Sequence, residues 1–167
     1  VEYNILVINP GSTSTQVGIF QNERCVVERS LSHSLKELSL DVDDQRGFRE
    51  KAIKEFISDS GFNVEEFHGI AARGGRLKPL SSGTYLLNDE MLEDSYDKTD
   101  GNHASRLAVI IGEQMAKVAN CPLYIVDPIS VDEMIDEARI SGMPDIERRS
   151  LSHALNLKAV GRKTAQD

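Results

Sequence analysis

The hydrophobic and polar positions of the first 31 residues fall into short blocks separated by turn-forming residues. Residues 4–8 (NILVI) form a short apolar run of the kind that suits a strand buried on both faces of a sheet. Apolar stretches at 17–20 and 24–31 follow, with Gln21 and Asn22 as a turn signal between them. The pattern predicts three successive strands joined by hairpins.

The period then changes to that of a helix. Apolar residues recur at intervals of three and four before Gly61, at Phe48, Ala52, Ile53, Phe56 and Ile57. Further patterns predict a strand over 69–72, a short helix over 89–96, a longer helix over 107–118 and a buried strand in PLYIVDP. Ser130 and Glu133 have the spacing of a capping box, so a helix is expected to begin there.

The order β-β-β-α-β-α-β-α predicts a mixed α/β sheet with helices on its faces. Ligands of such sheets gather at the carboxyl ends of the strands. Asn9, Arg73 and Asp127 all fall at or just after predicted strand ends. We therefore expect the functional site at that edge.

The first candidate site is the connection NPGSTST between the first two strands. Gly11 permits backbone conformations closed to other residues, and Ser12, Thr13 and Ser14 offer hydroxyl and amide donors that could surround phosphate oxygens. The alternative is an ordinary hairpin in which Ser and Thr serve turn and strand propensity. The segment lacks the lysine of a P-loop, so it is not a Walker site.

The second candidate is ARGGRLKP, where Arg73, Arg76 and Lys78 surround two glycines in an otherwise acidic chain. Arginine binds carboxylate or phosphate with a two-pronged fork, and glycines let the backbone approach a ligand. Solvated surface charge is the alternative interpretation.

Three further side chains could take part in chemistry. Asp127 follows an apolar strand and is either a carboxylate that faces magnesium or substrate, or a residue that satisfies amides at the start of a helix. His103 and His153 could be catalytic, although a single histidine is more often structural or exposed.

Composition and charge restrict the function classes. Hydrophobic residues make up 40% and charged residues 28% of 167 residues, which is typical of a globular protein. The net charge of −8 argues against nucleic acid or an anionic membrane surface as partner. No apolar run is long enough for a membrane span and no signal pattern is visible, so we expect a cytoplasmic protein.

In this order, the segments resemble the N-terminal half of the butyrate branch of the acetate and butyrate kinase family. The resemblance covers almost the whole chain, through ILVINPGSTST, FREKAIKEFI, ARGGRLKPL, NHASRLA, YIVDPISVDEM, ARISGMPDIERRS and HALNLKAV. The family implies a ribonuclease-H-like, mixed five-stranded sheet as one half of the two-domain ATPase fold shared with sugar kinases, Hsp70 and actin. It implies a first domain over residues 1–145 and the start of a second, truncated domain over 146–167.

The resemblance also implies roles for particular residues. The turn with Gly11, Ser12, Thr13 and Ser14 would hold the phosphates of ATP, and Asn9 and Asp127 would lie near Mg²⁺. Asp127, His153 and Arg73 would be the catalytic residues, with His153 stabilising the transferring phosphoryl group. His103 competes with Asn102 for a histidine–asparagine pair of acetate kinase. At Gln16 relatives usually carry a lysine, which implies a weaker nucleotide contact here.

The implied reaction transfers the γ-phosphate of ATP to butyrate or a branched analogue and gives an acyl phosphate. Acetate or propionate kinase activity is an alternative, and a non-catalytic, actin-like module that binds a partner protein is another. Because the family's adenosine-binding loops lie beyond residue 167, we expect a fragment that is inactive alone. The full-length family members are usually homo-oligomers.

Overall fold

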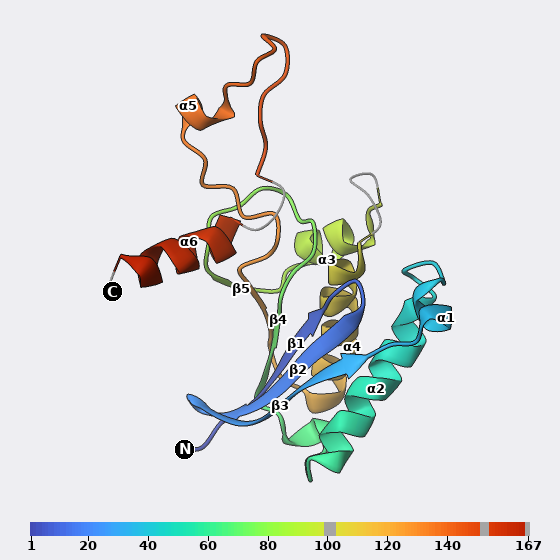
Figure 1. The fold of residues 1–167 in the computed structure, drawn as a ribbon. Helices are drawn as coiled ribbons and strands as arrows, with labels where there is room; N and C mark the ends of the chain where they lie inside the picture. Colours follow the sequence, from blue (N-terminus) through green and yellow to red (C-terminus); the bar gives the residue numbers. More distant parts are fainter. Residues whose placement is uncertain (99–102, 151–153, 166–167) are drawn as a thin grey trace.

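The computed structural model describes residues 1–98, 103–150 and 154–165. Six strands form one mixed sheet with the order β3-β2-β1-β4-β6-β5 (Figure 1). The strands are β1 (Asn4–Pro10), β2 (Ser14–Gln21), β3 (Arg24–Ser32), β4 (Gly69–Ala72), β5 (Thr84–Leu86) and β6 (Leu123–Val126).

Helices connect and flank the strands. The α-helices are α1 (Leu35–Leu38), α2 (Gln45–Asp59), α3 (Asp89–Tyr96), α4 (Leu107–Ala119), α5 (Asp136–Arg139) and α6 (Ala154–Thr164). Two 3₁₀ turns, η1 (Val64–Glu66) and η2 (Ala104–Arg106), precede β4 and α4. None of the helices within the described ranges is long and apolar enough to cross a membrane.

The first three strands form the predicted antiparallel meander. β1 pairs with β2 from Asn4 opposite Gln21 to Pro10 opposite Thr15. Asn22 has φ 52°, a left-handed conformation that asparagine tolerates better than most residues, and it turns the chain from β2 into β3. The hairpin prediction is confirmed.

The parallel strands β1, β4 and β6 form the centre of the sheet, so their carboxyl ends share one edge. β5 pairs antiparallel with β6 and adds a sixth strand to the five that were predicted. This strand has only three residues, of which two are exposed, so its sequence lacks the apolar run of a buried strand. The predicted α/β fold class is confirmed.

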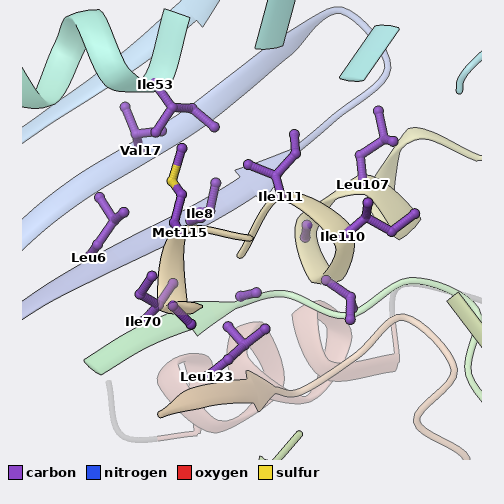
Figure 2. Packing of buried hydrophobic residues seen from close by; sticks show 14 of the residues in the cluster. Leu6, Ile8, Val17, Ile53, Ile70, Leu107, Ile110, Ile111, Met115 and Leu123 are labelled. Atoms are coloured by element: carbon purple, nitrogen blue, oxygen red, sulfur yellow. The ribbon is translucent and has the colours of Figure 1, made fainter. Parts of the chain in front are cut away.

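The hydrophobic core lies between the sheet and the two long helices α2 and α4. Alternate residues of the strands, Leu6 and Ile8 in β1 and Ile70 in β4, are completely buried. Figure 2 shows their side chains gathered with Ile53 of α2 and Met115 of α4 in one cluster. Burying aliphatic side chains of this size contributes roughly 1.5–3 kcal/mol each, so this layer holds the strands in place.

The opposite face of the sheet carries α6, while α2 and α4 lie on the core side (Figure 1). Val7, Ala71 and Val126 on this second face are half-buried, and α6 lies across a cavity from them. The C-terminal segment forms this helix over Ala154–Thr164.

The predicted capping box after β6 is wrong. Between the end of β6 and Asp136 no helix begins, and the Glu133 carboxylate instead accepts hydrogen bonds from the backbone N–H and hydroxyl of Ser82. The Ser130 hydroxyl accepts a hydrogen bond from the backbone N–H of Leu77. The segment after β6 runs beside residues 74–80 and is joined to them by a bridge between Leu80 and Val131. The Ser130 and Glu133 side chains therefore bind backbone groups of that neighbouring segment instead of capping a helix.

Candidate functional site

A cavity of about 1010 Å³ opens at the carboxyl ends of the parallel strands. Asn9, Arg73 and Asp127 line it, one from the end of each of β1, β4 and β6. The three residues that were expected at this edge are therefore brought together. They come from positions more than fifty residues apart in the sequence, so only the parallel pairing of the strands makes them neighbours.

Asp127 is held in an unusual backbone conformation. Its φ of 44° lies in the left-handed region, which non-glycine residues occupy at a cost of about 1 kcal/mol. Its Oδ1 accepts a hydrogen bond from the backbone N–H of Gly83 at 2.8 Å, and its own N–H donates to the Gly83 carbonyl at 3.0 Å. The alternative that Asp127 satisfies amides at the start of a helix is wrong, because its partner is the residue before β5. Its second oxygen makes no hydrogen bond to the described part of the chain.

The basic cluster of ARGGRLKP divides into separate environments. Arg73 lines the cavity, and its guanidinium makes no ion pair or hydrogen bond with the described residues. Arg76 is exposed. Lys78 forms an ion pair with Glu90 of α3, so it is partly neutralised. Of the three, only Arg73 offers an unpaired positive charge to the cavity.

The two glycines of this segment serve internal packing. A Cβ added to Gly74 would lie 2.6 Å from the Ile125 side chain, and one added to Gly75 would lie 2.7 Å from Cα of Arg106. Both glycines are buried. Their role is to let the segment after β4 pass close to β6 and η2, which directs Arg73 into the cavity. Neither glycine lines the cavity, so the approach to a ligand that was expected of them stays a prediction.

The turn between β1 and β2 lies at the same edge of the sheet, and its tip is exposed at Ser12 and Thr13. The backbone N–H of Gly11 donates to the Ser14 carbonyl at 2.8 Å and closes the turn. The backbone N–H groups of Ser12 and Thr13 make no hydrogen bond to any described residue. Gly11 itself does not have positive φ, so the special conformation expected of it is absent.

Of the two candidate histidines, the structure describes only His103. His103 caps η2, with Nδ1 accepting a hydrogen bond from the backbone N–H of Ser105 at 3.1 Å. Partial burial, and then the charges of Arg76 and Arg73, lower the pKa of His103, so the ring is neutral at pH 7. His103 therefore has the structural role of a cap. His153 lies outside the described residues.

Two basic residues of the cavity were missed by sequence reasoning. Lys158 and Arg162 of α6 line its outer wall. Lys158 forms an ion pair with Glu133, which also accepts from Ser82. The Lys158 ammonium and then the Ser82 hydrogen bonds lower the pKa of Glu133 from 4.5 to about 2. The spacing of four residues between Lys158 and Arg162 places both on one helix face and was the available signal.

The charge of the cavity differs from that of the whole chain. Its lining carries three basic side chains, Arg73, Lys158 and Arg162, and one acidic side chain, Asp127. The chain as a whole has a net charge of −8. Lys158 is paired with Glu133, so the positive excess rests on Arg73 and Arg162 against Asp127. This local charge attracts anions to the cavity despite the acidic surface.

The oxygen donors of the site suit Mg²⁺ better than a tightly bound metal. In the described ranges no three His, Cys, Asp or Glu side chains surround a common point. Asp127 and Asn9 line the cavity with one carboxylate and one amide. Mg²⁺ typically keeps several waters and binds through one or two carboxylates together with substrate phosphates. These residues fit an ion that arrives with a phosphorylated ligand.

Comparison with known proteins finds relatives of the chain in sequence and in structure. No protein-family model matches the chain. The probable butyrate kinase 1 of Thermotoga maritima is 48% identical over 99% of the chain and 47% of its own length. Butyrate kinase 1 of Clostridium acetobutylicum is 46% identical over the same shares. The chain spans about half the length of these curated relatives.

Solved structures of more distant proteins share the fold. The acetate kinase of Porphyromonas gingivalis superimposes with a TM-score of 0.62 at 11% identity, over 98% of this chain and 48% of that one. A propionate kinase from Francisella tularensis gives a TM-score of 0.59 at 17% identity over the same shares. Along almost its whole length, the chain is therefore similar in sequence to about half the length of curated butyrate kinases, and it shares its fold with the matching half of acetate and propionate kinases.

Proposed function

We propose that the chain provides the phosphate- and carboxylate-binding half of a kinase that transfers the γ-phosphate of ATP to butyrate or a branched analogue. The observation that supports this most directly is the convergence of Asn9, Arg73 and Asp127 on one cavity. The exposed turn with two unpaired N–H groups lies at the same edge of the sheet and would receive the phosphates.

The chemistry of the acceptor explains the shortage of acid–base groups in this cavity. A carboxylic acid with a pKa near 4 to 5 is ionised at pH 7, so it needs no general base to act as nucleophile. The difficulty is that an anion must approach an anionic phosphoryl group, which requires in-line placement and positive charge. Arg73 would hold the carboxylate or neutralise the equatorial oxygens, with Lys158 and Arg162 adding positive potential.

Asp127 would then orient rather than accept a proton. Its Oδ1 is bound to the Gly83 amide, which fixes the direction of the other oxygen. That second oxygen and Asn9 would hold Mg²⁺, either directly or through its waters. Bound Mg²⁺ would neutralise charge on the phosphates of the nucleotide.

We further propose that residues 1–145 form the first domain and that α6 belongs to a second domain, which supplies the adenosine contacts. His153 would stabilise the transferring phosphoryl group. Without the rest of the second domain the cleft cannot exclude water, so residues 1–167 alone would show negligible turnover. The site is expected to act on a small carboxylate in the cytoplasm, and the full-length protein is expected to form homo-oligomers.

The test measures acyl phosphate, trapped as the hydroxamate, with the full open-reading-frame product that contains this chain. Butyrate, isobutyrate, propionate and acetate are compared as acceptors, and butyrate or isobutyrate should give the highest kcat/KM. Arg73→Met should reduce kcat/KM by about 10²-fold, the size of one lost preorganised charge contact. Arg76→Met is the matched control, because Arg76 is exposed and does not line the cavity. Absence of acyl phosphate with all four acids would overturn the proposal.

A further inference from the structure

Arg49 of α2 is completely buried, yet the proposed chemistry does not use it. Its guanidinium lies beneath the β1–β2 turn: Nη1 donates to the Ser14 carbonyl at 3.3 Å and to the Thr15 hydroxyl at 2.9 Å. The Ser14 carbonyl is the same group that accepts from Gly11 and closes the turn. Arg49 therefore donates a hydrogen bond to the same Ser14 carbonyl oxygen that closes the turn.

The other side of the guanidinium is fixed as well. Nε and Nη2 of Arg49 both donate to Oε1 of Gln45, at 3.2 and 2.9 Å. The Gln45 amide in turn donates to the Leu40 carbonyl at 3.0 Å. The turn is thus tied through two buried side chains to the loop that precedes α2.

Every hydrogen-bond partner of Arg49 is neutral. No carboxylate of the described residues forms an ion pair with it, and burial alone lowers its pKa, although a guanidinium remains protonated. The nearby His33 contacts the Thr15 hydroxyl at 2.9 Å, and burial together with the Arg49 charge lowers the pKa of His33. His33 therefore adds no charge at pH 7. The Phe48 ring, whose centroid lies 5.7 Å from Cζ of Arg49, gives a cation–π contact, but no described residue places a negative charge against the guanidinium.

An uncompensated buried charge is costly, and proteins usually pair such a group. A bound polyphosphate at the tip of the turn would supply the missing negative charge. Neutral glutamine or methionine would fill the same space without this cost if the only task were packing.

We propose that Arg49 is a positioning residue for the phosphate-binding turn, which rests on the proposed function above. Its hydrogen bonds to Ser14 and Thr15 hold the turn so that the amides of Ser12 and Thr13 stay free for phosphate oxygens. Its charge makes the turn a better site for a polyanion. Arg49 does not contact the ligand.

The test compares ATP·Mg²⁺ and adenosine binding by calorimetry, with the full open-reading-frame product and its Arg49→Met variant. Without Arg49 the turn is no longer held, so the Ser12 and Thr13 amides are less well placed for the phosphates, and the loss of one hydrogen bond to a charged group weakens binding by about tenfold or more. We expect that loss for ATP, with adenosine affinity changed less than about twofold, because adenosine has no phosphates. Arg49→Lys keeps the charge but cannot make all of the hydrogen bonds, so it should recover part of the ATP affinity.

The control is Arg46→Met on the same helix, since Arg46 is half-buried and lies near Glu50 instead of the turn. It should bind ATP like the unchanged protein. If Arg49→Met does not fold, the same comparison is made with Arg49→Lys. Equal losses for ATP and adenosine, or unchanged ATP affinity, would overturn the positioning role. Failure of the unchanged protein to bind ATP at all would instead overturn the proposed function.

Discussion

The close passage of Gly75 beside η2 leads to a quantitative prediction about stability. A Cβ at position 75 would meet Cα of Arg106 at 2.7 Å and its backbone nitrogen at 2.9 Å. Both are backbone atoms, so no side-chain rotation can relieve the clash, and the buried Arg106 is further held by its Nε, which donates to the Ser95 carbonyl at 3.0 Å. Gly75→Ala must therefore move a backbone segment. Overpacking of this kind costs about 1–3 kcal/mol, and contact with backbone favours the upper part of that range.

The measurement is urea unfolding followed by far-ultraviolet circular dichroism. A loss of 2–3 kcal/mol corresponds to a midpoint about 1–2 M lower at ordinary urea dependence for a chain of this size. Gly47→Ala is the matched control, because nothing lies within 4 Å of a Cβ at this exposed helical position. It should stabilise the chain by about 0.5–1 kcal/mol. If Gly75→Ala unfolds within about 0.5 kcal/mol of the unchanged chain, the packing explanation of the glycine pair fails.

Substitutions at two further positions, Asp127 and Glu133, test stability and activity at the site. Asp127→Asn should change the unfolding free energy by less than about 0.5 kcal/mol, since asparagine tolerates positive φ and can accept from Gly83, whereas Asp127→Ala should lose about 1–2 kcal/mol. Both should reduce kcat by about 10²-fold or more in the full open-reading-frame product, and a fully active Asn variant would exclude a role for the charge. Glu133→Gln should lose the stabilising pair with Lys158, whose contribution is present above the ordinary carboxyl pKa of 4.5 and disappears as the pH falls toward the folded value of about 2. Unfolding curves at pH 7 and pH 2.5 check this: the difference between the two proteins should shrink at the lower pH, and a constant difference would contradict it.

Much of the fold could be predicted because the periodicities are local. The continuous apolar run of residues 4–8 marks β1, and the helical spacing of Ile53 and Phe56 marks α2. β5 could not be found in this way, because a three-residue exposed strand depends on pairing with β6 instead of on its own hydrophobic pattern.

The site was predictable in part, for a similar reason. Asn9, Arg73 and Asp127 follow apolar strands, and parallel pairing carries strand ends to one edge. Lys158 and Arg162 come from a helix whose position over the sheet has no local signal. The spacing of Ser130 and Glu133 led to the wrong prediction of a helix start. Spacing alone does not reveal that the backbone N–H groups of Leu77 and Ser82 bind the same side-chain oxygens.

By itself, the sequence determined five of the strands and the longer helices, the chain's acidity, and its likeness to a kinase family, because these follow from side-chain type and local spacing. Tertiary structure alone decided that Arg49 lies beneath the turn, that Gly74 and Gly75 pack against backbone and side chains, and that Glu133 binds Ser82 and Lys158. These contacts join residues far apart in the chain. Which residues meet depends on how the helices pack against the sheet, and the spacing of residues along the sequence does not reveal that packing.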